Sequence, residues 1–167
     1  MNNAQIFLDF FSLDLIVLTF FEFCDCPEME SLPLNPRHII SYNHNMVTKL
    51  ENTELVWVDQ PQKLYEVTHE LAAQDIIAVD TESNSLYAYQ EQVCLIQFST
   101  HKKDILIDTL AIPDLSPLKP IFSSEAILKV FHAAEYDLIC LFRDYGFKFN
   151  FLFDTMIAAR TKKKKKI

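Results

Sequence analysis

Hydrophobic and polar positions follow two different rhythms between residues 54 and 161. Short apolar runs of strand length recur along this part of the chain, each bounded by polar or turn-forming residues. Leu64, Val67 and Leu71 recur instead with helical spacing, after the helix-start signals Asp59 and Pro61. The predicted strands cover residues 55–58, 76–82, 93–99, 104–108 and 127–131.

The connections between these runs indicate how the strands are arranged. The three strands between residues 76 and 108 are joined by short polar links, so they are expected to form an antiparallel meander. A short helix over 117–122, the strand at 127–131 and a helix over 134–145 follow. A meander followed by β-α units predicts an α/β fold with a mixed sheet and helices packed on it.

The helix over 134–145 has clear end signals and a defined apolar side. Gly146, directly after it, favours a left-handed turn that ends the helix. Asp154 can cap a further helix that starts near Thr155. The side chains expected to face inward from the helix over 134–145 are Leu138, Leu141, Phe142 and Tyr145.

The segment before this domain is apolar but does not have the pattern of a membrane span. Asp9, Asp14 and Glu22 interrupt the apolar stretch over 6–23, and an acid near the centre of a span costs roughly 2.5–3.5 kcal/mol. No Lys or Arg precedes Arg37, so the positive region of a signal peptide is missing. We therefore expect no membrane segment here.

The change of character along the chain suggests a division into three parts. We expect an extension over 1–50, a domain over 51–161 and a lysine-rich tail over 162–167, with Met46 as a candidate natural start. Three interpretations of the tail stay open. It is a solvated run of charge, a tether for nucleic acid, or the sign of a chain cut short before its sheet is fully covered.

Composition narrows the class of protein and the kind of partner. Hydrophobic residues make up 50% of the chain, which excludes a disordered or collagen-like protein. Gly146 is the single glycine, so tight turns are expected to rest on Asn, Asp, Ser and Pro. The net charge of −8 argues against broad electrostatic binding of nucleic acid, but it allows an acidic site where cations handle phosphates.

The cysteines point to a reduced compartment. Cys24, Cys26, Cys94 and Cys140 have no spacing typical of a disulfide framework. Cys94 and Cys140 lie in apolar runs, where free thiols are commonly buried. We therefore expect a cytoplasmic protein.

Two carboxylates follow the apolar run of the second predicted strand. Asp80 and Glu82 come directly after residues 76–79, in the stretch VDTES. Residues two apart lie on one face of a strand, so the two charges would repel each other beside the core. They are either solvated acids at a strand end or ligands of a divalent cation such as Mg²⁺ or Mn²⁺, which prefers oxygen ligands.

A third carboxylate, Asp137, lies in the first turn of the helix over 134–145. Taken alone, it is a favourable charge near a helix N-terminus, worth about 0.3–1 kcal/mol. If the strand at 127–131 pairs with the strand at 76–82, however, Asp137 comes to the same sheet edge as Asp80 and Glu82. Ligands bind at such edges in sheets of this kind.

The motifs around these acids resemble a known family. VDTESNSL and VCLIQFST, followed by KVFHAAEYDLICL and FDTMIAAR, are similar in order and spacing to the ribonuclease D group of 3′–5′ exonucleases, in the DEDD superfamily. The similarity covers residues 54–160. It implies a ribonuclease H-like exonuclease fold and metal-dependent hydrolysis of phosphodiester bonds at the 3′ end of RNA, with DNA as the second candidate substrate.

The resemblance also implies roles for the three acids. Asp80 would bridge two divalent metal ions, Mg²⁺ or Mn²⁺. Glu82 would hold the ion that activates water, and Asp137 would support the other ion. Two bound cations can generate hydroxide and stabilise both the attacking and the leaving oxygen of the displacement.

Other polar residues near these motifs are weaker candidates. Asn84 and Leu86 are candidates for contacts to the terminal nucleotide, although ordinary packing is the better explanation of Leu86. His132 is a further substrate candidate, but a hydrogen-bonded structural histidine is the commoner case. Asp154 is explained by its helix cap, and the matching family position is not a metal ligand.

The third motif of the family has no counterpart in this sequence. In the family, a Tyr or His three residues before a final Asp lies downstream of the FDTMIAAR match, and the residues up to Ile167 contain no such pair. We therefore expect the fold to be C-terminally incomplete and the 167-residue chain to have little or no nuclease activity of its own. The alternatives are a non-catalytic nucleic-acid-binding or scaffold remnant of the same fold, or an unfolded fragment. The sequence does not predict an oligomeric state.

Overall fold

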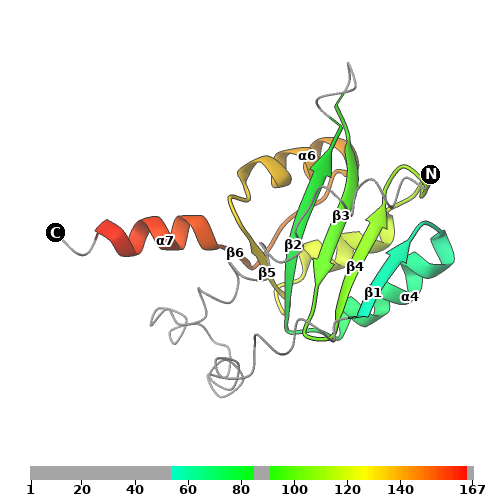
Figure 1. The fold of residues 1–167 in the computed structure, drawn as a ribbon, viewed down its shortest axis with the longest axis horizontal. Coiled ribbons are helices and arrows are strands. Elements are labelled where there is room, and N and C mark those ends of the chain that lie inside the picture. Colours follow the sequence, from blue (N-terminus) through cyan, green and yellow to red (C-terminus); the bar gives the residue numbers. More distant parts are fainter. Residues whose placement is uncertain (1–53, 85–90, 165–167) are drawn as a thin grey trace.

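The computed structural model describes residues 54–84 and 91–164, which form a mixed sheet with helices packed against it (Figure 1). The strands are β1 (Glu54–Val58), β2 (Ile76–Ser83), β3 (Val93–Ser99), β4 (Lys103–Asp108), β5 (Leu128–Phe131) and β6 (Leu152–Asp154). The α-helices are α4 (Pro61–Ala72), α5 (Lys119–Ser123), α6 (Glu135–Tyr145) and α7 (Thr155–Lys164), and a 3₁₀ turn, η3 (Ser116–Leu118), precedes α5.

The strand order is β1-β4-β3-β2-β5-β6. Strands β2, β3 and β4 form the predicted antiparallel meander, and β5 pairs in parallel with β2. The mixed sheet and its β-α units are therefore confirmed. Strand β6, parallel to β5, was not predicted, because it is three residues long and its apolar pattern is too short to read.

One continuous core lies between the sheet and the helices. Leu64, Val67 and Leu71 of α4 are buried there, as their helical spacing predicts. Phe122 of α5 is also buried, and its ring stacks on Phe147 with the ring centroids 4.9 Å apart. Because α4, α5 and α6 all contribute to this single cluster, they cover the same face of the sheet.

Alternation along β2 decides which side chains meet these helices. Ile77 and Val79 belong to the core cluster. Asp80 and Glu82 alternate with them and so lie on the opposite face of the sheet. Thr81 lies on the helix-covered face, between the two acids in sequence.

Helix α6 confirms most of the pattern expected for it. Its last turn ends at Gly146, which is left-handed (φ 64°) and donates its backbone N–H to the Phe142 carbonyl at 2.8 Å. Leu141 is fully buried, and Leu138 and Tyr145 pack against the core. The prediction for Phe142 is wrong, because its side chain is 63% exposed. It lies one position, about 100° of helix rotation, beyond Leu141.

Two backbone positions contradict the expectation that turns rest on Asn, Asp, Ser and Pro. Ala133 (φ 61°) and Phe151 (φ 51°) are left-handed without being glycine. Hydrogen bonds hold both: the Ala133 amide donates to Asp154 at 3.3 Å, and the Phe151 carbonyl accepts from the Lys129 amide at 3.0 Å. These bonds offset the steric cost of the conformation.

Helix α7 extends away from the sheet in Figure 1 and continues to Lys164, so three residues assigned to the lysine-rich tail are helical.

The structure describes two of the four cysteines. Cys94 and Cys140 are buried and free, as predicted. Cys24, Cys26 and the extension over 1–50 lie outside the described residues. Within the described part of the chain, no helix is long and apolar enough to cross a membrane.

Candidate active site

The end of β2 places two acids at the edge of the sheet. Asp80 lies opposite Gln97 of β3 and Glu82 lies opposite Leu95, so both acids share one face with these partners. The register shifts between Glu82 and Ser83, where β2 ends. Both carboxylates are partly buried.

Strand β5 brings the third acid to the same edge. It pairs in parallel with β2, with Ala78 opposite Val130, and the chain turns into α6 four residues after its end. Asp137 lies in the first turn of α6 and is only 9% exposed. The Thr81 hydroxyl donates a hydrogen bond to Asp137 Oδ1 at 2.5 Å, which joins β2 to α6.

Burial and neighbouring acids destabilise the charged forms of all three carboxylates. Burial, together with the charges of Asp137 and Glu82, raises the pKa of Asp80 to about 7. Burial and Asp137 also raise the pKa of Glu82. Burial raises the pKa of Asp137 despite the hydrogen bond from Thr81. The structure thus collects negative charge at one place without compensating it.

This donor set has the chemistry that a hard divalent cation requires. All three ligand candidates are carboxylates, and in the described residues no Lys or Arg forms an ion pair with any of them. Nevertheless, within residues 54–84 and 91–164 no three Asp, Glu, His or Cys side chains are arranged to hold a metal ion as they stand. Asp80 and Glu82 approach from one face of the sheet, whereas Asp137 is engaged by Thr81 from the other. The chemistry of the three carboxylates suits a hard cation, and Asp137 lies close enough to Asp80 and Glu82 for its charge to raise the pKa of both.

Asp154 has a different task. Its Oδ1 accepts hydrogen bonds from the amides of Met156 (2.8 Å) and Ile157 (3.0 Å), which caps α7 as predicted. It also accepts from the Ala133 and Ala134 amides at the start of α6. Burial would raise the pKa of Asp154, but these four amides hold it below its usual value.

The weaker candidates are placed as follows. His132 is exposed, and its Nδ1 lies 2.8 Å from the Thr155 hydroxyl, which supports the structural interpretation. Asn84 forms two hydrogen bonds with Gln92. Its backbone amide donates to the Gln92 carbonyl at 3.1 Å, and its Oδ1 accepts from the Gln92 amide at 2.9 Å, so the two residues join the end of β2 to the start of β3. Leu86 lies outside the described residues.

Comparison with known proteins shows the family. The profile of a 3′-5′ exonuclease family matches residues 55–166. The chain belongs to the 3′-5′ exonuclease family. Its members of the ribonuclease D type have the ribonuclease H-like fold and generally depend on divalent metal ions.

Individual relatives agree with this assignment. The exonuclease domain is 45% identical over 101 residues to Protein RRP6-like 3 of Arabidopsis thaliana, covering 60% of this chain and 11% of that protein. It is 40% identical over 106 residues to the exosome complex exonuclease RRP6 of Saccharomyces cerevisiae, covering 63% of this chain and 14% of that protein. The chain thus spans a small part of the length of the curated relatives that it matches.

Solved structures give the same result. The catalytic core of RRP6 from Trypanosoma brucei superposes with a TM-score of 0.64 at 36% identity, covering 66% of this chain and 32% of that one. Escherichia coli RNase D, described as an exoribonuclease involved in structured RNA processing, superposes with a TM-score of 0.60 at 33% identity, covering 64% and 28%.

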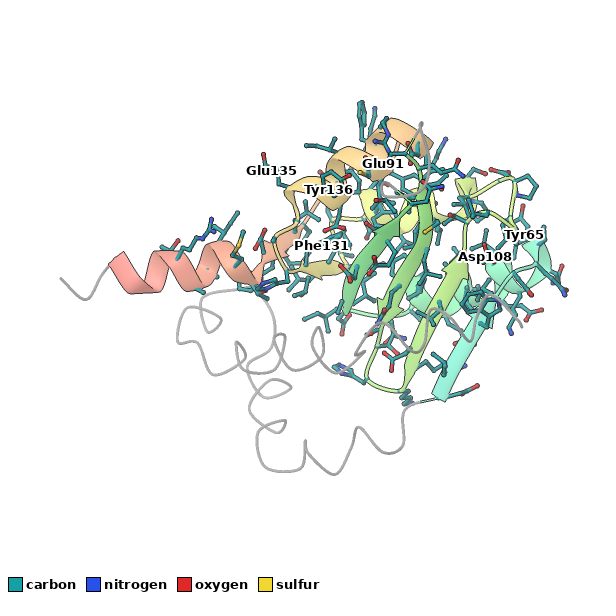
Figure 2. All side chains as sticks on the ribbon, turned by 45° about the horizontal axis from the view of Figure 1, so that its top comes forward. Tyr65, Glu91, Asp108, Phe131, Glu135 and Tyr136 are labelled. Carbon is teal, nitrogen blue, oxygen red and sulfur yellow. The ribbon has the colours of Figure 1, made fainter. Side chains whose placement is uncertain are left out.

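Sequence reasoning missed a polar cluster that joins the exonuclease domain's β2–β3 connection to α6. The Tyr136 hydroxyl donates a hydrogen bond to Glu91, and the two side chains lie side by side in Figure 2. Arg143 forms an ion pair with Glu91 at 3.4 Å and with Asp144 at 2.6 Å. The Asp144 carboxylate in turn accepts a hydrogen bond from the Val93 amide at 2.8 Å. Arg and Asp on successive residues of a helix were the only sequence signal, and it does not name the distant partners.

Proposed function

We propose that Asp80, Glu82 and Asp137 bind two divalent metal ions, Mg²⁺ or Mn²⁺, and that this domain hydrolyses phosphodiester bonds at the 3′ end of RNA. The observation that carries the proposal is the uncompensated charge at the end of β2, where burial and neighbouring acids raise the pKa of Asp80 to about 7. Burying acids together without a cation is costly. Family membership supports the assignment, and so do the RNA-processing relatives that the chain resembles.

The chain's own residues would act mainly by placing oxygen ligands. Asp80 and Glu82 lie on β2, where β3 pairs with the backbone of both acids and β5 pairs with the residues before them, 76–78. Asp137 lies on a helix tied to that strand by Thr81. Divalent cations bound there would supply a hydroxide nucleophile and stabilise the charge that develops on the phosphate oxygens.

The chain's net charge of −8 agrees with an enzyme that works on a chain end rather than along a duplex. RNA is the favoured substrate and DNA the second candidate. We also keep the prediction of a cytoplasmic location, which rests on the buried free thiols Cys94 and Cys140.

The 167 residues contain no Tyr or His three positions before an Asp after Arg160. The test of function therefore supplies the family's third motif from a relative. For this test, residues 55–160 would replace the matching segment of Escherichia coli RNase D. The resulting chimera would be incubated with 5′-labelled single-stranded RNA and Mn²⁺.

We expect the chimera to shorten the RNA in single-nucleotide steps from its 3′ end. Asp80→Asn should abolish this activity, while Asp59→Asn, at an exposed position before α4, should leave it unchanged. A folded chimera without activity would favour the alternative, a non-catalytic nucleic-acid-binding or scaffold domain.

A further inference from the structure

Thr81 lies between Asp80 and Glu82 in sequence but points toward the other face of β2. That face is covered by the helices, and Asp137 of α6 lies on it. The hydroxyl of Thr81 donates to Asp137 Oδ1 at 2.5 Å, a contact between residues 56 positions apart. Thr81 of β2 therefore makes a direct hydrogen bond to the third acid.

The hydrogen bond from Thr81 to Asp137 is expected to be strong, because its acceptor is a buried carboxylate. A hydroxyl that donates to a carboxylate makes a short, charge-assisted bond, about twice as strong as one between neutral groups. Asp137 is 9% exposed, so water competes little for Oδ1. Among the described side chains, Thr81 is the hydrogen-bond donor to this carboxylate, and Oδ2 has no side-chain donor.

The bond fixes one oxygen of the Asp137 carboxylate. A side chain held at Oδ1 has few rotamers left, and its Oδ2 keeps one direction relative to β2. Asp80 and Glu82 are fixed to the same strand, because Thr81 shares their backbone. The position of the third carboxylate relative to the first two therefore depends on its contacts with Thr81.

We propose that Thr81 is a positioning residue, whose hydroxyl holds Asp137 in register with Asp80 and Glu82 for divalent-metal binding. This inference rests on the proposed function, since it needs the three acids to be ligands. Residues that hydrogen-bond a ligating carboxylate typically change metal affinity by 10–100-fold when they are replaced. Thr81 touches neither the metal nor the substrate in this proposal and acts through Asp137.

The test measures the binding of Mn²⁺ to the full 167-residue chain by titration calorimetry, with no nucleic acid present. Thr81→Val keeps the shape and removes the donor, whereas Thr81→Ser keeps the donor. Thr68→Val is the matched control, because the Thr68 hydroxyl of α4 is buried and has no hydrogen-bond partner. Circular dichroism of each variant shows that the fold is retained, and Thr81→Ala replaces Thr81→Val if the latter does not fold.

We expect Thr81→Val to weaken Mn²⁺ binding by about 10–100-fold. Thr81→Ser should stay within about threefold of the wild type, and Thr68→Val should bind as the wild type does. A purely structural role would lower the melting temperature without this split between the Val and Ser variants.

Two other outcomes overturn the inference in distinguishable ways. If the wild type binds Mn²⁺, Asp137→Ala weakens binding and Thr81→Val does not, then Thr81 is not a positioning residue and the proposed function stands. If the wild type shows no saturable binding, the proposed function fails, and the role of Thr81 fails with it.

Discussion

Asp154 of β6 accepts a hydrogen bond from the backbone amide of Ala134, 2.8 Å away at the entrance to α6. The same carboxylate caps α7 through Met156 and Ile157. One side chain therefore fixes the start of two helices, one of which carries Asp137.

Removing that carboxylate should destabilise the fold. We expect Asp154→Ala to lower the free energy of unfolding by roughly 2–4 kcal/mol, because it leaves the amides at both helix starts without an acceptor. Asp154→Asn should cost less, since it keeps one acceptor oxygen. Urea unfolding measures both, with Asp59→Ala at an exposed position as the control. Equal stability of Asp154→Ala and the control would show that water replaces the carboxylate.

The left-handed backbone at Ala133 predicts a stabilising substitution. Ala133→Gly should raise the free energy of unfolding by about 0.5–1 kcal/mol, because glycine adopts φ 61° without the clash that alanine has. Ala72→Gly, in the last turn of α4, should lower it by a similar amount. Thermal unfolding of the two variants therefore shifts in opposite directions. A loss of stability in both would mean that the turn at Ala133 is not strained.

The acids at the end of β2 predict how stability depends on pH. The unfolded chain loses the Asp80 proton near pH 3.8 and the folded chain near pH 7, so the folded state binds more protons in between. The stability of the metal-free chain should therefore fall as the pH rises from about 4 to 7.

Asp80→Asn should remove much of this loss, because asparagine does not ionise. At pH 8 without metal we expect the variant to be more stable than the wild type by about 2 kcal/mol, with little difference below pH 4. Asp75→Asn, at an exposed position before β2, is the matched control. Denaturant unfolding at both pH values measures the difference. A wild type that is the more stable of the two at pH 8 would contradict the account.

Lys129 of β5 is fully buried on the helix-covered face, where its Nζ donates to the Ser124 carbonyl at 2.5 Å. Burial lowers the pKa of Lys129 to about 8. The charged form thus costs stability below pH 8, and this cost is relieved as the pH rises toward 10.5, the pKa of an unperturbed lysine.

Lys129→Met should make the chain more stable at pH 7 by roughly 1–2 kcal/mol. The free-energy cost of burying the charged ammonium is larger than the stabilisation that its hydrogen bond to Ser124 contributes. The gain should shrink at pH 10, and unfolding at the two pH values measures it. Lys102→Met, at an exposed position, is the control. A destabilised Lys129→Met would mean that the bond to Ser124 outweighs the burial of the charge.

The sequence predicts the sheet well because its strands are set by apolar runs with turn residues between them. The span from Val93 to Ser99 is predicted to the residue. Strand β6 is not predicted, because it is defined by its pairing with β5 and its own three residues show no strand pattern. Phe142 shows the limit for helices, since the apolar residues of α6 do not all lie on one stripe and only tertiary packing selects among them.

The candidate acids could be named from sequence, but their mutual geometry could not. Nothing in the spacing of Thr81 and Asp137 indicates a hydrogen bond, because the contact depends on β5 pairing with β2 and on the turn at Ala133. The left-handed conformation of Ala133 could not be predicted from residue preferences, because glycine and asparagine are the residues that usually adopt it. The role of Asp154 as a shared cap likewise needs the fold.

The proposed activity depends on divalent cations bound by Asp80, Glu82 and Asp137 together. The most direct measurement is electron paramagnetic resonance of free Mn²⁺ during titration of the chain, which counts bound ions. We predict saturable binding of up to two ions per chain, strongly weakened by Asp80→Asn and by Asp137→Asn and unaffected by Asp75→Asn. Binding that is the same in the wild type and in Asp80→Asn would contradict it.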